Sequence, residues 1–158
     1  EVIEFPIQRL EQPQITTESL WATTDAIARQ KGLQLGPWGL EHTLWLVWRE
    51  LIAQNLQTPD LVWVLEDDVP RCRQTILLRR PVTFGMDYSV RQSYACMIDP
   101  SIRNVIESIL DRDVEINEVK ARWELKLEAQ SFGLEEGDLI TAEIIRAELR
   151  EREESSNL

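Results

Sequence analysis

The segment from Gly36 to Asn55 constrains the fold more than any other part of the sequence. Gly36 can serve as the N-terminal cap of a helix, and Pro37 suits its first position. Apolar residues then recur at the spacing of one helix face. These apolar residues are Leu40, Leu44, Val47, Trp48 and Leu51. The pattern predicts an amphipathic helix over residues 37–55, whose apolar stripe other elements must cover.

Further helices are predicted on both sides of this segment. Thr17 is placed to cap a helix that precedes it, and another helix is predicted to begin at Asp99, which is followed by proline and serine. Apolar residues farther along have the spacing of two more helices, one over residues 117–131 and one that starts at Asp138 or Thr141. The C-terminal third is therefore predicted to be helical.

Extended segments are predicted between these helices. Residues 61–65 form a short, continuous apolar run that is typical of a buried strand. Residues 75–79, 81–84 and 89–98 are also predicted to be extended, with a turn at Gly85. We therefore predict an α+β fold with N-terminal helices, a small, largely antiparallel sheet in the middle and a helical C-terminal third.

The length of 158 residues favours one domain, because a chain of this size can bury a single sufficient core. Residues 1–15 are predicted to form an extended arm, and residues 150–158 are predicted to fray. No stretch approaches the roughly 20 apolar residues that span a bilayer, and the first residues lack a signal-peptide pattern. Two cysteines without CxxC spacing indicate a reducing compartment. We therefore expect a cytoplasmic protein that does not bind a membrane.

Negative charge is concentrated towards the C-terminus. The net charge is −11, and residues 107–158 carry 15 acidic and 7 basic residues, a net of −8. A surface of this sign repels phosphate backbones, so general nucleic-acid binding is disfavoured. Every catalytic template that we compared lacks an essential residue. We therefore expect a non-catalytic interaction or regulatory factor that meets another protein through helical and acidic surfaces and needs no cofactor.

Three carboxylates, Glu66, Asp67 and Asp68, follow the apolar run of residues 61–65. Carboxylates at the end of a buried strand are typical of sites that hold a divalent cation against a phosphate. A P-loop is excluded because the GxxxxGK[ST] motif is absent, and a receiver domain is excluded because no lysine follows a suitable strand. The alternative is a solvated strand end whose charges pair with Arg71 and Arg73.

Residues 36–69 resemble the middle of lipopolysaccharide-type glycosyltransferases. The resemblance rests on Gly36-x-x-Gly39, on Trp48 and on the motif Leu65-Glu66-Asp67-Asp68-Val69. Where the family has a Ser-His pair, this chain has Thr43-Leu44, with His42 one position earlier. The resemblance implies that Glu66, Asp67 and Asp68 help to hold Mg²⁺ or Mn²⁺ and a sugar nucleotide. A metal-dependent, glycosyltransferase-like transferase is therefore the enzymatic alternative.

One side of the predicted helix over residues 37–55 is a candidate partner-binding surface. His42 lies opposite the apolar stripe, beside Leu46 and Arg49, and Trp45 lies about 100° around the helix from the stripe. Aromatic side chains are frequent at the energetic centres of interfaces. We therefore predict that Trp45, His42, Leu46 and Arg49 form a partly exposed strip that binds a partner, with burial in the core as the alternative.

Four arginines, Arg71, Arg73, Arg79 and Arg80, form the one concentrated positive region of the sequence. On a shared face they could contact phosphate or nucleic acid, which would make the protein a nucleic-acid accessory subunit. The acidic face of the protein could instead mimic DNA. The other interpretation is that these arginines balance the acidic C-terminal helices.

Overall fold

A computed structural model describes residues 15–67, 69–79, 82, 86–112, 126–127 and 129–156 of the chain, with the side chains of residues 37, 38 and 112 left out. The predicted extended arm and the predicted strand over residues 81–84 therefore lie almost entirely outside the described residues. The same is true of most of the helix predicted over residues 117–131, of which residues 126–127 and 129–131 are helical.

Helices make up most of the described chain. They are α1 (Thr17–Gln30), α2 (Pro37–Ala53), α3 (Arg73–Leu78), α4 (Tyr88–Met97), α5 (Pro100–Arg112) and α7 (Ala142–Ser156). The strands are β1 (Trp63–Glu66), β2 (Val69–Cys72) and β3 (Leu139–Ile140). The predicted α+β class is confirmed, with N-terminal helices, a small antiparallel sheet in the middle and a C-terminal helix.

The sheet has the strand order β2-β1-β3, and both neighbouring pairs are antiparallel. Trp63 lies opposite Cys72 on one side and opposite Ile140 on the other, and all three side chains are buried. Side chains alternate along β1, so that Trp63 and Leu65 face the core while Val64 and Glu66 are half-buried. The sheet therefore has one face in the core and one face towards solvent.

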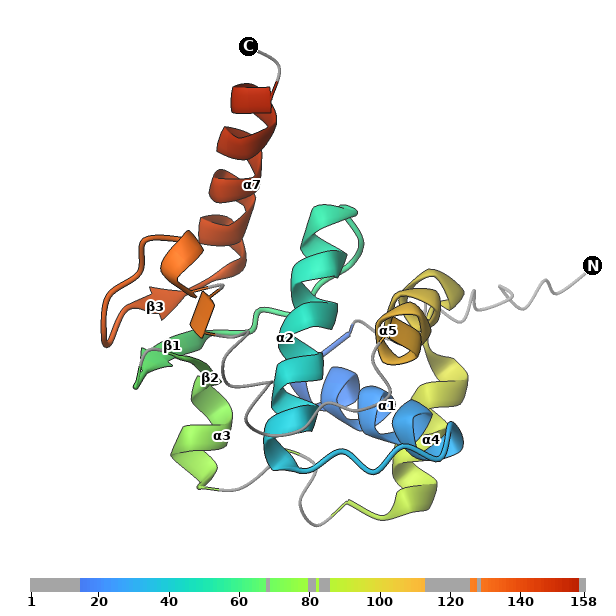
Figure 1. Cartoon of the computed structure of the whole chain (residues 1–158). Helices are drawn as coiled ribbons and strands as arrows, with labels where there is room; N and C mark the ends of the chain where they lie inside the picture. The colour runs from blue at the N-terminus through green and yellow to red at the C-terminus, as the bar shows by residue number, and fades with distance from the viewer. Residues whose placement is uncertain are drawn as a thin grey trace, which may run out of the picture.

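Helix α2 runs through the centre of the molecule (Figure 1). The sheet and α3 lie on one side of it, α1, α4 and α5 lie on the other side, and α7 projects from the sheet next to the upper part of α2. Three buried tryptophans join α2 to the sheet. The ring of Trp45 lies 5.6 Å from Trp48 and 5.1 Å from Trp63, and the rings of Trp48 and Trp63 are 6.0 Å apart, between centroids. This tryptophan cluster is the part of the core that holds the two layers together.

Two predicted strands are helices in the structure. Residues 75–79 were predicted to be extended but fall largely within α3, which ends where Arg79 adopts a left-handed φ of 56°. Residues 89–98 were also predicted to be extended, but α4 covers most of them and packs along α1. Both predictions were wrong because these segments have weak intrinsic preferences, and packing against neighbouring elements then decides the conformation.

The start of α1 differs from the sequence prediction. Thr16, rather than Thr17, caps α1: its hydroxyl accepts from the Ser19 backbone N–H, and the Ser19 hydroxyl accepts from the Thr16 backbone N–H. At the other end of the described chain, α7 continues to Ser156, within the segment 150–158 that is predicted to fray, and this fraying stays a prediction. Among the described residues, no helix combines the length and the apolar character needed to cross a membrane.

Candidate functional site

Helix α7 is exposed over most of its surface. Ala142 and Ile145 are its buried residues, Glu148 and Leu149 are half-buried, and residues 150–156 are exposed on every side of the helix. Figure 1 shows this outer part of α7 projecting beyond the rest of the molecule. An isolated helix of this length is marginal in water, so the exposed turns gain little from the core.

One residue connects the outer part of α7 to the body of the protein. Arg152 Nε lies 3.3 Å from Glu148 Oε1, one helical turn earlier, and Arg152 Nη2 lies 3.1 Å from Ser131 Oγ. The guanidinium group also stacks over Phe132, 5.0 Å from the ring centroid. Exposed contacts of this kind contribute little stability, about 0.5–1 kcal/mol each. Arg152 therefore helps to orient α7, but residues 150–156 of the helix stay exposed to solvent.

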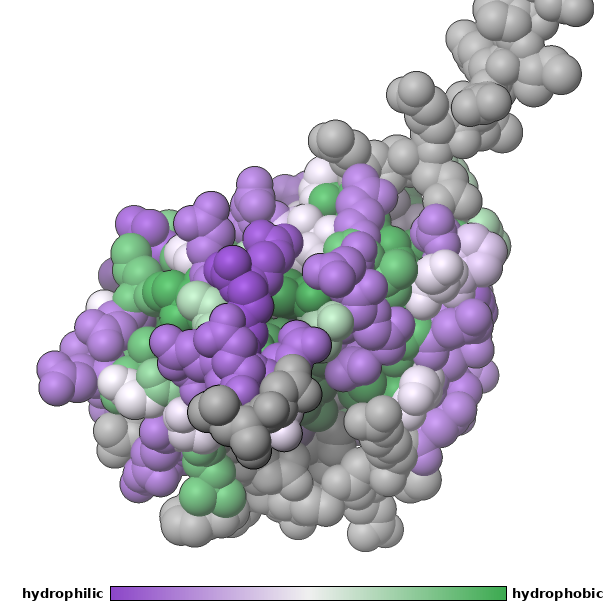
Figure 2. Space-filling model, turned by 90° about the horizontal axis from the view of Figure 1, so that it is seen from above, coloured by the Kyte–Doolittle hydropathy of each residue, from purple (hydrophilic) through white to green (hydrophobic). Residues whose placement is uncertain are grey.

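The surface around α7 is acidic. Residues 135–156 contain eight acidic residues and three arginines, a net charge of −5. Seen from above, where the free end of α7 points towards the viewer, hydrophilic residues dominate the centre of the surface (Figure 2). Four carboxylates in α7 form no ion pair with a described residue: Glu143, Glu151, Glu153 and Glu154. This helix therefore presents negative charge to any partner that approaches it.

The predicted partner-binding strip on α2 is largely buried. Trp45 has an exposed fraction of 0% and His42 of 2%, so the prediction that they are partly exposed was wrong. Leu46 and Arg49 are half-buried. The reason is that α1, α5, α7 and the sheet pack around α2, which leaves no broad solvent face. The apolar stripe of α2 in the sequence predicts one buried helix face, whereas in the structure several faces of α2 are buried.

The predicted metal cluster lies at the tip of a hairpin. Glu66, the last residue of β1, pairs with Val69, the first residue of β2, and Asp67 follows Glu66 in the connection between the two antiparallel strands. Asp67 has a φ of 53°, the left-handed conformation that such turns require and that aspartate tolerates. Glu66 therefore ends a strand, as the sequence predicts, and Asp67 follows it in a turn. Asp68 lies outside the described residues, and the described ones contain no group of three potential metal ligands. Binding of Mg²⁺ or Mn²⁺ stays a prediction.

Of the four arginines, the structure shows the contacts of Arg71. Arg71, on β2, turns inward: its Nε donates to Glu41 Oε2 at 2.9 Å, and its Nη1 lies 3.9 Å from Glu66 Oε1. Arg73 begins α3 and Arg79 follows its last residue, while Arg80 lies outside the described range. The structure therefore shows charge pairing within the protein for Arg71, and a phosphate-binding role for the others stays a prediction.

Glu41 is a buried acidic residue that the sequence does not point to. Its exposed fraction is 3%, and it connects α2 to β2. Besides the contact with Arg71, its Oε1 accepts a hydrogen bond of 2.7 Å from the Cys72 backbone N–H. Burial raises the pKa of Glu41, although the Arg71 guanidinium and the Cys72 N–H act in the opposite direction. Burial also raises the pKa of the Cys72 thiol, so this cysteine is not an activated nucleophile.

The raised pKa of Glu41 predicts how stability depends on pH. The Glu41 carboxyl group binds its proton more tightly in the folded state than in the unfolded chain. Protonation of Glu41 therefore contributes its full stabilisation of the fold below the ordinary pKa of 4.5, and this contribution is lost as pH rises through the pKa of the folded state. We expect the free energy of unfolding of the wild type, minus that of Glu41→Gln, to fall over this range. Urea unfolding of both proteins between about pH 4 and pH 8 measures the difference. A difference that increases with pH would contradict the raised pKa.

Comparison of the chain with protein-family models, with curated proteins and with solved structures finds no match.

Proposed function

We propose that the chain is a non-catalytic interaction factor that binds a partner protein through the outer part of α7. The observation that supports this proposal is that residues 150–156 are helical although they are exposed on every side. A helix gains most of its stability in proteins from packing against another surface. A partner that covers these turns would supply the packing that the body of the protein does not.

The charge of α7 defines the kind of partner. Residues 135–156, which include α7 and the segment before it, carry a net charge of −5, of which α7 itself carries −2 and residues 150–156 carry −1. This charge favours a basic protein surface that also contacts the segment before α7, because opposite potentials speed association and exclude wrong partners. Such binding weakens as salt screens the charges. The seven residues from 150 to 156 span about 10 Å along the helix axis, so the contact includes neighbouring surface as well.

The proposal is tested with a variant that removes charge from α7. Glu151 and Glu154 lie three residues apart and therefore share one side of the helix. After a stoichiometric partner has been isolated from the native source and purified, we expect Glu151→Gln with Glu154→Gln to weaken its binding about tenfold at low salt. Isothermal titration calorimetry at two salt concentrations measures the affinity, and the difference between the proteins should shrink at high salt.

A matched control removes the same charge elsewhere. Glu18 and Asp60 are exposed carboxylates outside α7, and Glu18→Gln with Asp60→Asn should leave the affinity unchanged. A truncated chain that ends at Arg150 should retain its fold, because the residues removed are exposed, but should lose the partner. If the truncated chain binds as tightly as the full chain, α7 is not the binding element.

A further inference from the structure

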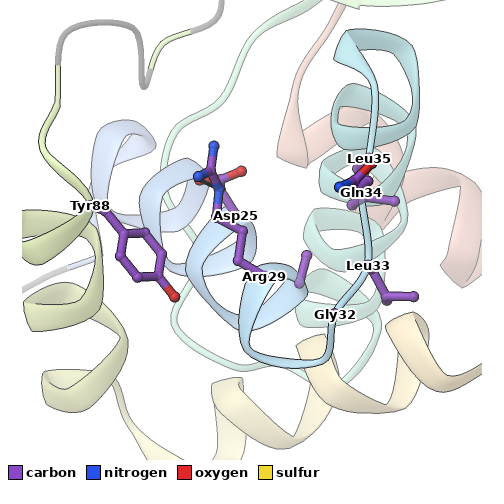
Figure 3. Close-up of a pocket in the computed structure, with 8 residues that line it drawn as sticks. Asp25, Arg29, Gly32, Leu33, Gln34, Leu35 and Tyr88 are labelled. Carbon is purple, nitrogen blue, oxygen red and sulfur yellow. Dashed lines mark ion pairs between the residues drawn. The ribbon is translucent and has the colours of Figure 1, made fainter.

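A pocket of about 510 Å³ lies beside the C-terminal half of α1 (Figure 3). Tyr88, the first residue of α4, flanks it on one side, and the segment that connects α1 to α2 flanks it on the other side. The volume is within the range of sites that bind small molecules, about 300–1,000 Å³. The pocket is independent of α7, which does not contribute to its lining.

The polar wall of the pocket is a carboxylate held by two arginines. Asp25 Oδ2 lies 2.7 Å from Arg91 Nη1 and 3.3 Å from Arg29 Nε. Arg91 also donates from Nη2 to the Met86 carbonyl at 2.8 Å, which anchors the group to the start of α4. Asp25 thus pairs with two guanidinium groups, of which that of Arg29 belongs to the lining of the pocket.

Arg29 is the part of this wall that a ligand can reach. Its side chain is 55% exposed, whereas the side chains of Asp25 and Arg91 are 15% and 14% exposed. The guanidinium group lies 5.6 Å from the Tyr88 ring centroid. Nε faces Asp25, and the two terminal nitrogens donate no hydrogen bond to a described residue. These two nitrogens form a planar fork that matches the two oxygens of a carboxylate.

The connecting segment lines the other side of the pocket with Leu33, Leu35 and the exposed polar side chain of Gln34. Leu33 and Leu35 are half-buried, and Ala28 on α1 is buried. Figure 3 shows Leu33 and Leu35 on the connecting segment, across the end of α1 from Tyr88. The pocket thus combines one available cation and an aromatic ring with hydrocarbon surface, which suits a ligand that has a charged end and an apolar body.

We propose that this pocket binds a small organic acid that carries one carboxylate on an apolar or aromatic body. The carboxylate would pair with the terminal nitrogens of Arg29, and the body would contact Leu33, Leu35 and the Tyr88 ring. A phosphate ester is a poorer match, because a doubly charged group would face Asp25 with only one exposed cation to balance it.

Phenylacetate and phenylacetamide test the proposal, because they share an aromatic body and differ in the charge of the end group. Titration of the isotope-labelled full chain, followed by two-dimensional NMR, should show saturable shifts for Arg29 and for the backbone amides of residues 32–35. We expect phenylacetate to bind about tenfold more tightly than phenylacetamide. Equal affinities, or no saturable shift up to about 10 mM of either compound, would overturn the proposal.

Two variants separate the polar and apolar contributions. Arg29→Gln should weaken phenylacetate binding about tenfold and phenylacetamide binding much less, since the neutral amide does not form an ion pair with the guanidinium group. Leu35→Ala should weaken both compounds by a similar factor. Arg150→Gln, which neutralises an exposed arginine on α7, is the matched control and should bind both like the wild type. If Arg29→Gln binds phenylacetate as tightly as the wild type does, the assignment of the pocket is wrong.

Discussion

Replacement of Trp63 by alanine is expected to lower the free energy of unfolding by about 3–5 kcal/mol. Trp63 is fully buried and contacts Trp45 edge-on, with ring centroids 5.1 Å apart. The substitution removes both the buried aromatic surface and the packing between α2 and the sheet, and it leaves a cavity. Total stabilities of single domains are about 5–15 kcal/mol, so the loss is a large part of the whole. Urea unfolding followed by circular dichroism measures it.

Two further variants test the reason for this effect. Trp63→Phe should cost less than Trp63→Ala, because an aromatic ring still packs and because the buried Trp63 Nε1, which has no hydrogen-bond partner among the described residues, is removed. Leu77→Ala is the exposed control: with 71% of Leu77 exposed, its effect should be within about 0.5 kcal/mol. A loss for Trp63→Ala no greater than that for Leu77→Ala would show that the tryptophan cluster does not hold the layers together.

The second large effect is expected for Glu41→Ala, which should lower the free energy of unfolding at neutral pH by about 2–4 kcal/mol. The buried N–H of Cys72 loses its acceptor, and Arg71 loses its ion pair with the Glu41 carboxylate. The substitution also opens a space between α2 and β2, where the Glu41 side chain is buried. Denaturant unfolding at pH 7 measures the change.

Glu41→Gln separates the contribution of the Glu41 hydrogen bonds to stability from the contribution of its charge. The amide oxygen can still accept from the Cys72 N–H, so this variant should be more stable than Glu41→Ala. Glu151→Ala removes a carboxylate from an exposed helix position and should change stability by less than about 0.5 kcal/mol. Equal effects of Glu41→Ala and Glu151→Ala would mean that the connection between α2 and β2 contributes no stability.

The elements that the sequence predicted well have strong internal periodicity. The apolar residues of α2 recur on one stripe, and those of α5, namely Ile102, Val105, Ile106 and Ile109, are all buried as their spacing predicts. Such patterns are local, so they can be read without knowledge of the rest of the fold. The apolar run of residues 61–65 likewise predicted β1, although the strand itself begins at Trp63.

The elements that were missed depend on contacts between distant segments. A strand as short as β3 carries no pattern of its own, and it exists because it pairs with β1. Helix α4 depends on packing along α1. Strand β2 was not predicted, because it is short and contains Pro70, which is uncommon inside a strand.

The candidate sites were harder to predict than the fold, because burial is a property of the whole molecule. His42 and Trp45 lie off the main apolar stripe, yet further elements cover them. Glu41 shows no signal in the sequence, since a glutamate on a helix is usually solvated. The one exposed arginine at the α1 pocket becomes distinctive only when Tyr88, more than fifty positions later, is placed beside it.

The pairing of β3 with β1 has a consequence for how the protein is made. Leu139 pairs with Val64, and at a synthesis rate of about 5–20 residues per second the ribosome needs roughly 4–15 s to add the intervening residues. Until then the outer edge of β1 presents unpaired backbone groups on the nascent chain, a template for pairing with other chains. The hairpin of β1 and β2 is thus translated well before β3, and the outer edge of β1 is covered only after β3 has been added.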